Sequence, residues 1–336
     1  MFSRPIRTFL VAAWVALLAV LGLEGAVRIW GYAEHNIYDP IYTSFDGTPD
    51  IPYVHKPNLK AARARGLSVI NTDSLGLRAK SAGASYGAKR PGEYRIAIVG
   101  DSCTFGEGVP RTEDTFPQVL EAALNKQQAV TVKVFNFGAS AYSVKEMTAT
   151  LEYRMLDVEP DLVIMALIPQ DFDLSRVPTI DSSGYFVDRR LPSRVNFTVL
   201  NILRRVHLVY VLRDLGSRWF PASHASAPPL SSGQVPESYR HLYHFKEVAA
   251  QRGLSYVVVL VPMGENAWGA LPSRLARDSI RHIDLAHLNK EFTGEQFMAS
   301  RFDPHPSAAV HRRIGETLAD YVINVQWKER SDAASR

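Results

Sequence analysis

The stretch Tyr94-Arg-Ile-Ala-Ile-Val-Gly-Asp-Ser-Cys-Thr-Phe-Gly106 contains an apolar run that stops abruptly at a small polar tripeptide. The run Ile96–Val99 is typical of a buried parallel strand. Gly100, Asp101 and Ser102 follow it, and all three favour turns. Because ligands of an open α/β sheet collect beyond the carboxyl ends of its strands, we expect the Ser102 hydroxyl to face a crevice. On the tripeptide alone, an ordinary turn at the end of a strand explains these residues equally well.

Apolar strand patterns alternate with helix patterns through much of the chain. Strands are predicted at about 95–99, 130–135, 162–167 and 256–261, and helices at about 116–125, 143–155, 237–252 and from Ser307 onward. This alternation predicts an α/β fold, with a parallel sheet covered by helices on both faces. Between residues 173 and 236 the alternation is replaced by a helix near 198–215 and a Pro- and Ser-rich loop over 221–233.

The beginning of the sequence predicts a membrane anchor. Arg4 and Arg7 precede the uncharged apolar run Phe9–Leu23, and Glu24 follows it. The run is shorter than the roughly 20 residues of a typical span and suits a signal-peptide core, but no clear small-x-small cleavage site follows it. Apolar character then resumes, and Trp30 suits a membrane interface. We expect an uncleaved single-pass anchor with the rest of the chain extracytoplasmic, in the periplasm or at the cell surface. A cleaved signal peptide and a soluble buried helix are the alternatives.

Composition limits the remaining possibilities. The 336 residues are enough for a large core, and the net charge of +4 comes with only short basic clusters, so we expect no nucleic-acid partner. The single cysteine excludes an internal disulfide. We expect an anchor over residues 1–30, an extended lead-in over 31–93, an α/β domain over 94–325 with an insertion at about 173–236, and a polar tail over 326–336.

Three further stretches lie where they could join Ser102. Gly138 follows the second predicted strand, Gln170 follows the third, and Asp303-Pro-His-Pro306 precedes the last helix. Each has a structural explanation: a turn glycine, a solvated loop residue and the start of an Asx turn. Their combination with Ser102 favours a site, because a nucleophile, amide donors and an Asp/His pair each lie next to the end of a strand or helix.

These four blocks resemble the signature blocks of the GDSL/SGNH hydrolases over about residues 94–325. The anchor, the segment Asn71–Arg78 and the charges after the apolar run also resemble those of membrane-anchored bacterial envelope members. The resemblance implies a flavodoxin-like three-layer α/β/α sandwich that acts on acyl esters, often acetyl groups on glycans.

The same resemblance implies roles for individual residues. Ser102 would be the nucleophile, His305 its general base and Asp303 the acid that orients the imidazole. The oxyanion hole would comprise the N–H groups of Ser102 and Gly138 and the side-chain amide of Gln170. Two departures from the family pattern stand out. Gln170 replaces the family's asparagine with a side chain one methylene longer, and Asp303 precedes His305 by two residues rather than the more usual three.

Cys103, His311 and the Asp284/His287 pair could support other chemistries. Cys103 is an intrinsically better nucleophile than Ser102, but adjacent residues point apart, so we expect it to face the core. His311 lies within the predicted last helix beside two arginines, which disfavours a metal cation. Asp284 and His287 form another Asp/His pair, with Asp-x-x-His spacing and without a following helix start, and we interpret them as structural or surface residues. No metal or cofactor is predicted.

The sequence therefore predicts an SGNH/GDSL-type serine esterase or O-acyltransferase. The expected substrates are O-acyl groups, above all O-acetyl groups, of an envelope or extracellular polysaccharide. Besides an acylated glycan or small acyl ester and the membrane, candidate partners are polysaccharide-biosynthesis proteins and acyl-donor membrane proteins. The alternative is a catalytically weak or inactive domain that binds glycan or serves as an assembly subunit.

Overall fold

The computed structural model describes residues 4–65, 68–127, 130–175, 179–187, 199, 202–219, 237–264 and 267–328. The predicted loop over 221–233 lies outside these residues, as do parts of the predicted helix near 198–215 and most of the predicted tail. The chain forms two compact units, one comprising Met1–Ile37 with Arg190–His224 and the other comprising Tyr38–Arg189 with Ala225–Arg336.

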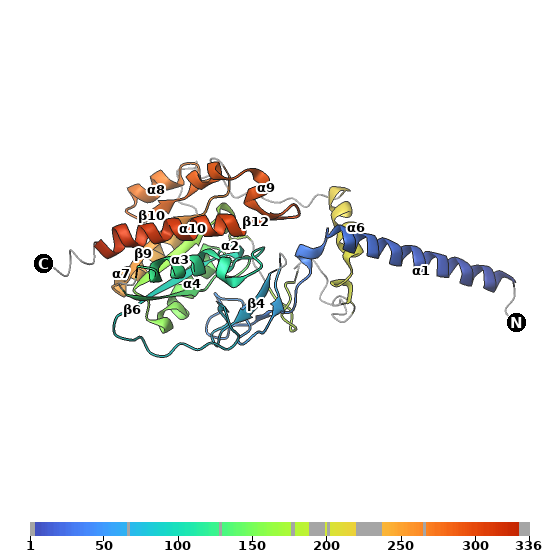
Figure 1. Cartoon of the computed structure of the whole chain (residues 1–336), viewed down its shortest axis with the longest axis horizontal. Helices are drawn as coiled ribbons and strands as arrows, with labels where there is room; N and C mark the ends of the chain where they lie inside the picture. The colour runs from blue at the N-terminus through green and yellow to red at the C-terminus, as the bar shows by residue number, and fades with distance from the viewer. Residues whose placement is uncertain are drawn as a thin grey trace. The chain divides into compact units, whose positions relative to one another are not determined.

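The larger unit is built on a parallel sheet of five strands (Figure 1). In chain order these are β6 (Glu93–Gly100), β7 (Thr131–Asn136), β8 (Leu162–Leu167), β9 (Ser255–Leu260) and β10 (His282–Asp284). Their spatial order is β7-β6-β8-β9-β10, so the chain reverses direction across the sheet between β6 and β8. This is the flavodoxin-like order, and a ligand site is expected at the reversal point, beyond the end of β6.

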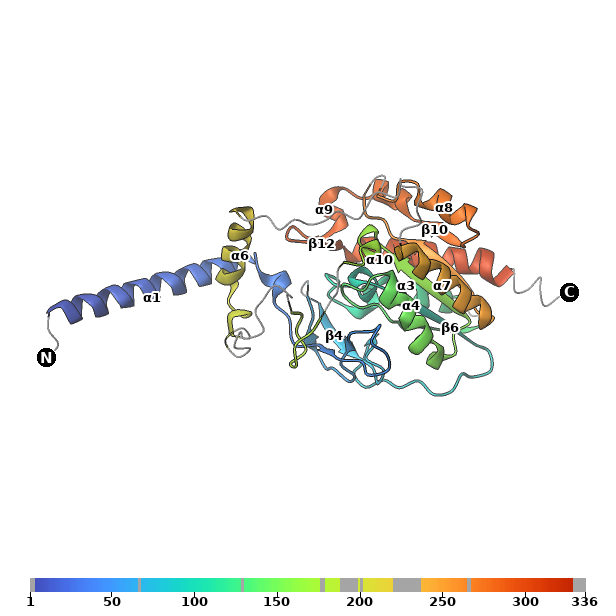
Figure 2. The same cartoon turned by 180° about the vertical axis from the view of Figure 1, so that it is seen from behind.

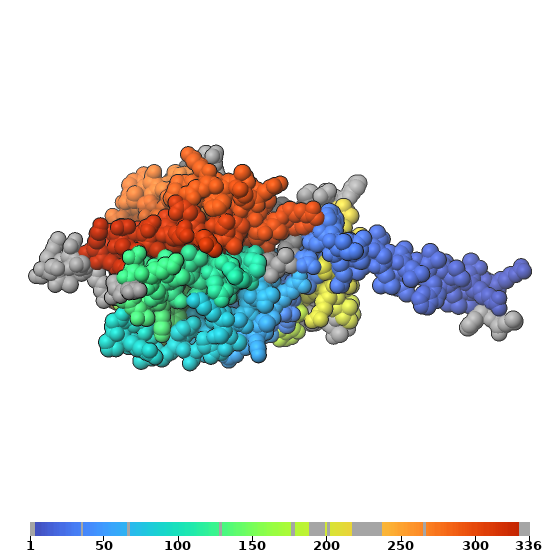
Figure 3. Space-filling model, in the orientation of Figure 1, coloured from blue at the N-terminus to red at the C-terminus, as the bar shows by residue number. Residues whose placement is uncertain are grey.

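Helices cover both faces of the sheet, because strand side chains alternate between the faces. Ile96 and Ile98 point to the face that packs against α3 (Phe116–Asn125) and α10 (Ala308–Tyr321). Ala97 and Val99 point to the face that packs against α4 (Val144–Tyr153) and α7 (Glu237–Gln251). Figures 1 and 2 show the two faces, and in Figure 3 the last helix runs alongside the α3 segment. The predicted three-layer α/β/α fold is therefore confirmed.

Local sequence signals fix where these helices begin. Ser143 and Glu146 form a capping box at the start of α4, and Pro117 occupies the first turn of α3. Ser307 caps α10, where its side chain accepts from the Val310 N–H. The shorter elements around the sheet are α2 (Ser102–Phe105), α8 (Leu271–Arg277), α9 (Gly294–Phe297), β11 (Met298–Ser300), β12 (Asp303–Pro306), η2 (Thr112–Asp114), η3 (Met155–Val158), η4 (Pro169–Phe172), η5 (Ala286–Glu291) and the π-helical turn η6 (Val322–Gln326).

The segment before β6 forms small antiparallel sheets. β1 (Tyr42–Thr43) pairs with β2 (Val54–His55), and β4 (Val69–Thr72) lies between β3 (Ala62–Arg63) and β5 (Arg78–Ala79). Arg78, in β5, is buried against the turn that follows α2. Its guanidinium donates to the carbonyl oxygens of Phe105, Gly106 and Val109. The predicted lead-in thus helps to shape the region around Ser102.

The smaller unit contains a long apolar helix, α1 (Arg4–Trp30), a short η1 turn (Glu34–Asn36) and the helix α6 (His207–Trp219). α1 is the one described helix that is long and apolar enough to cross a membrane, with a mean hydropathy of 2.2, and a signal sequence would pass the same test. Glu24 of α1 accepts from the backbone N–H groups of His207 and Leu208, at 3.0 and 2.8 Å. It therefore satisfies donors in the first turn of α6.

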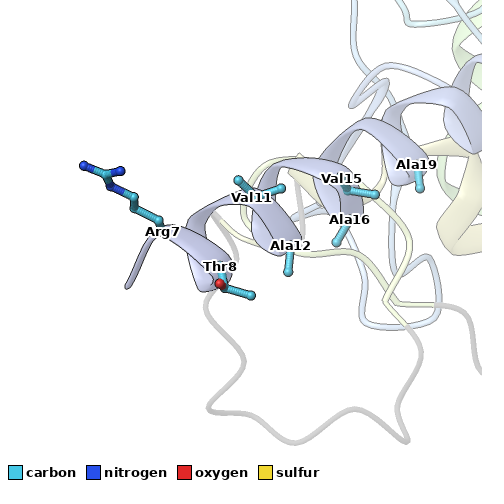
Figure 4. Close-up of a pocket in the computed structure, with 7 residues that line it drawn as sticks. All are labelled: Arg7, Thr8, Val11, Ala12, Val15, Ala16 and Ala19. Carbon is cyan, nitrogen blue, oxygen red and sulfur yellow. The ribbon is translucent and has the colours of Figure 1, made fainter. Parts of the chain in front are cut away.

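A shallow hollow lies along one face of α1 (Figure 4). Its lining consists of seven α1 residues, mostly alanine and valine: Arg7, Thr8, Val11, Ala12, Val15, Ala16 and Ala19. Residues three or four positions apart share a face of a helix, so this hollow is a groove between the side chains of α1 itself. It contains none of the predicted site residues.

Candidate active site

The turn after β6 presents Ser102 at the carboxyl edge of the sheet. Asp101 caps the four-residue helix α2, with its side chain accepting from the Cys103 N–H at 2.9 Å. Two glycines make the turn compact. A Cβ atom at Gly100 would lie 2.0 Å from Thr104 Oγ1, and one at Gly138 would lie 2.4 Å from the backbone nitrogen of Phe105. Only glycine fits at either position, so both predicted turn glycines have a packing reason.

The structure brings together Ser102, His305 and Asp303, which are far apart in the sequence. β12 carries the Asp-Pro-His-Pro block and contacts α2. His305 Nε2 lies 3.0 Å from Ser102 Oγ, and His305 Nδ1 lies 2.6 Å from Asp303 Oδ1. Because an ionised carboxylate can only accept, the Asp303 contact requires a proton on Nδ1 of the neutral imidazole. Nε2 is then available to accept from the Ser102 hydroxyl, which also lies within donating distance of Asp101 Oδ2, at 3.3 Å. This is the arrangement that a general base needs.

The surroundings of His305 raise its pKa. Burial lowers the pKa, but the hydrogen bond that His305 donates to Asp303 and the negative charges of Glu107, Asp303 and Asp101 together outweigh that effect. A histidine with a raised pKa is protonated over a wider range of pH, and only its neutral form can take a proton from Ser102. The site is therefore expected to become active at a higher pH than it would with an unperturbed histidine.

Glu107 is a member of the site that the motifs did not indicate. Its side chain is only 1% exposed, and its Oε2 lies 3.5 Å from His305 Nε2. Its other oxygen accepts a hydrogen bond from Ser140, whose hydroxyl lies 2.8 Å from the Tyr42 hydroxyl. One sequence signal pointed to it: Glu107 is an acidic residue between Gly106, which ends the stretch quoted first, and Gly108.

The predicted oxyanion donors are placed differently from one another. The Gly138 N–H donates to Asn136 Oδ1 at 3.0 Å, so it is already engaged within its own loop. Gln170 is exposed in η4, directly after β8, while its neighbour Asp171 is buried and accepts from the Ile168 N–H at 2.8 Å. The oxyanion roles of Ser102, Gly138 and Gln170 stay predictions.

The competing residues have structural surroundings. Cys103 is buried in the core, and burial, followed by the charges of Asp101 and Asp171, raises its thiol pKa well above the usual range. A thiol in this state is a poor nucleophile because it resists forming the thiolate.

His311 is fully buried in α10, and its Nδ1 accepts from the Phe116 N–H at the start of α3. Burial, with Arg78 and His305 nearby, lowers its pKa to about 3, so it is neutral at physiological pH. Asp284 and His287 are exposed. Across the residues that the structure describes, no cluster of three or more His, Cys, Asp or Glu could hold a metal ion.

The flavodoxin-like sheet and the Ser102–His305–Asp303 contacts define an α/β fold with a serine-centred triad. Solved structures similar to the chain include a lipolytic protein of the G-D-S-L family from Desulfitobacterium hafniense. It is 15% identical with a TM-score of 0.40, and the match covers 67% of this chain and 97% of that one. A lipase/acylhydrolase from Enterococcus faecalis is 14% identical with a TM-score of 0.38, covering 68% and 95%.

A two-domain esterase active on acetylated mannans is also similar, at 15% identity and a TM-score of 0.43. That match covers 70% of this chain and 50% of the esterase, so the chain spans about half of its length. These neighbours are GDSL/SGNH lipolytic proteins and esterases, the family that the four sequence blocks resemble. At this identity the likeness concerns the fold alone. No protein-family model and no curated protein matches the chain.

Proposed function

We propose that the chain is a serine ester hydrolase or O-acyltransferase that forms an acyl-enzyme on Ser102. The observation that carries this proposal is the unbroken series of contacts from Ser102 Oγ to His305 Nε2 and from His305 Nδ1 to Asp303, at 3.0 and 2.6 Å. A hydroxyl, an imidazole and a carboxylate in this order can remove the serine proton as the serine attacks a carbonyl carbon.

The reaction would proceed in two halves. Ser102 Oγ bonds to the ester carbonyl carbon while its proton passes to His305 Nε2, and Asp303 stabilises the imidazolium that results. The C–O bond to the alcohol then breaks, and His305 returns the proton to the departing alkoxide oxygen. In the second half, water or a sugar hydroxyl gives its proton to His305 and attacks the acyl carbon. The acyl C–O bond to Ser102 then breaks, and His305 returns the proton to Ser102 Oγ. Hydrolysis and transfer differ only in that acceptor.

The proposed substrates are O-acyl groups, most simply O-acetyl groups, of an envelope or extracellular polysaccharide. Two features support this choice: the family resemblance of the sequence blocks and the apolar helix α1 near the start of the chain. An uncleaved anchor would hold the α/β domain near the membrane on its extracytoplasmic side, where such polymers are assembled. Acyl-donor or polysaccharide-assembly membrane proteins would be its partners there.

One observation favours the alternative of a catalytically weak domain that binds glycan or supports assembly. The Gly138 N–H is engaged by Asn136 and would have to be shared with, or released to, a developing oxyanion. An oxyanion hole that lacks one well-aimed hydrogen-bond donor lowers the catalytic rate by a factor of about 10²–10³. Activation of Ser102 by His305 would nevertheless persist in such a protein.

A serine-directed fluorophosphonate probe tests the proposal on the full chain in detergent. We expect covalent labelling of wild type, located at Ser102 by peptide mass spectrometry, and none in Ser102→Ala or His305→Ala. Hydrolysis of a small acetyl ester, measured alongside, separates the two functions. Labelling with turnover supports an esterase, and labelling that yields turnover only with an added sugar acceptor supports a transferase. An unlabelled wild type would refute the proposal and leave the glycan-binding role.

A further inference from the structure

Glu107 reaches the active site through the backbone that follows the nucleophile. α2 ends at Gly106, which adopts a left-handed conformation with φ of 89°. The next residue turns back, so that the Glu107 N–H donates to the Ser102 carbonyl oxygen at 3.0 Å. This hydrogen bond fixes the Glu107 backbone relative to Ser102, although the two residues lie five positions apart. The Glu107 side chain is thereby tied to the geometry of the nucleophile.

The two oxygens of Glu107 have different surroundings. Oε1 accepts from the Ser140 hydroxyl, which is itself within hydrogen-bonding distance of Tyr42. Oε2 accepts no hydrogen bond from the described residues and lies 3.5 Å from His305 Nε2. Leaving a buried carboxylate oxygen without a donor is costly, so its retention beside an imidazole favours a role that arises when the imidazole gains a proton.

We propose that Glu107 is a positioning residue of the catalytic unit, a second carboxylate that stabilises the protonated form of His305 from the Nε2 side. This inference rests on the proposed acyl transfer through Ser102. Asp303 faces Nδ1, whereas Glu107 faces Nε2, the nitrogen that receives the Ser102 proton. When that proton arrives, the positive charge of the imidazolium lies beside Glu107 Oε2, while the Nε2–H remains available to the departing alkoxide oxygen. The imidazolium would then have a carboxylate at each nitrogen.

Other charged groups also surround His305, so a test must separate their effects on the imidazole from that of Glu107. Asp303 on β12 and Asp101 before α2 contribute negative charge to the imidazole. Arg65, from the segment before β6, interacts with the charges of both Glu107 and Asp303. Buried His311 on α10 stays neutral under the influence of burial, Arg78 and His305. Among the described residues that carry a negative charge near His305, Glu107 is the one beside Nε2, so removing its charge while keeping its shape isolates its effect.

Removing the charge of Glu107 should shift the pH dependence of Ser102 reactivity in a defined direction. Glu107 raises the pKa of His305, and His305 must be neutral to take a proton from Ser102. In Glu107→Gln the pKa of His305 falls, so the site should become active at lower pH than in wild type. An opposite charge within about 4–6 Å shifts a pKa by roughly 1–3 units when it is well placed. We expect the acid limb to move down by about one pH unit, because Asp303 still supports the imidazolium.

The rate of fluorophosphonate labelling at Ser102, followed from about pH 5 to 9 on the full chain, measures this limb without a known substrate. Glu107→Gln should shift the midpoint downward, and Glu113→Gln should not. The control removes an equal charge from an exposed residue of η2 in the same stretch of chain. Equal midpoints for wild type and Glu107→Gln would overturn the inference, whereas an unlabelled wild type would overturn the proposed function instead.

A second variant keeps the inference testable if the Glu107→Gln protein does not fold. Glu107→Asp retains the charge but shortens the side chain by one methylene, which withdraws the carboxylate from His305 Nε2. Its midpoint should lie below that of wild type, by less than the glutamine shift. A midpoint equal to that of wild type would overturn the inference by itself, whatever the effect on the labelling rate.

Discussion

Arg78→Lys tests whether the segment before β6 shapes the active-site turn. The Arg78 guanidinium is buried and donates to the carbonyl oxygens of Phe105, Gly106 and Val109, at 3.2, 2.6 and 2.8 Å. Burial lowers its pKa to about 10, so it remains charged at neutral pH. Lysine keeps the charge but has a single ammonium group in place of the planar fork.

The expected loss of stability follows from the backbone carbonyl groups that lose their hydrogen-bond donor. A lysine ammonium cannot reach all three oxygens, so one or two buried carbonyls lose their donor, at about 1–3 kcal/mol each. We expect Arg78→Lys to lower the free energy of unfolding by about 2–4 kcal/mol, which a domain of ordinary stability survives. Since Glu107 directly follows Gly106, fluorophosphonate labelling of Ser102 should slow as well.

Denaturant unfolding followed by tryptophan fluorescence, with the full chain in detergent, measures this change. The matched control is Arg111→Lys, because Arg111 also pairs bidentately, with Asp114, but is exposed. It should leave the unfolding midpoint unchanged within error. If Arg78→Lys and Arg111→Lys prove equally stable, the guanidinium does not hold the turn and the reasoning fails.

Three further predictions concern the proposed site. Cys103→Ala should leave labelling of Ser102 largely intact, and loss of labelling would mean that the neighbouring thiol is the nucleophile. Asp303→Asn should slow ester turnover by about 10³–10⁴, because the amide no longer fixes the imidazole tautomer, while Asp284→Asn, at an exposed site, should match wild type. Gln170→Ala should lower kcat on a small acetyl ester by about 10²–10³. Gln170→Asn should also lower it if the loop is adapted to the longer side chain, and equal rates for all three proteins would remove residue 170 from the mechanism.

The sequence predicted the central sheet well because its strands are strongly apolar. The run Ile96–Val99 lies inside β6, and the strand predicted at 162–167 coincides with β8. β10 was not predicted, since His282–Asp284 is a three-residue edge strand with two polar side chains. The strands before β6 were also not predicted, since most span only two residues and show no periodicity.

The candidate site could be predicted only in part, and the limits are physical. Ser102, His305 and Asp303 stand at the ends of elements with recognisable motifs, and the structure brings all three together. Glu107 was not predicted, because a single glutamate in a glycine-rich turn is expected to be exposed to solvent. Its burial depends on contacts with His305 and Ser140, which are distant in sequence, and no local pattern encodes them.

Glu24 makes the end of α1 part of a folded structure. Its carboxylate accepts from the first two N–H groups of α6, and Arg28 pairs with it at 2.7 Å while donating to the Arg205 carbonyl oxygen. Proteolytic cleavage after Gly25 would remove Glu24, and with it the side chain that accepts from the first N–H groups of α6. Cleavage by a signal peptidase would therefore weaken the start of α6, by about 0.5–2 kcal/mol for the loss of a cap. A mature protein that begins at Met1 and whose α6 amides exchange slowly would be the anchored state. In that state a carboxylate of the apolar helix caps a second helix that begins more than 180 residues further along the chain.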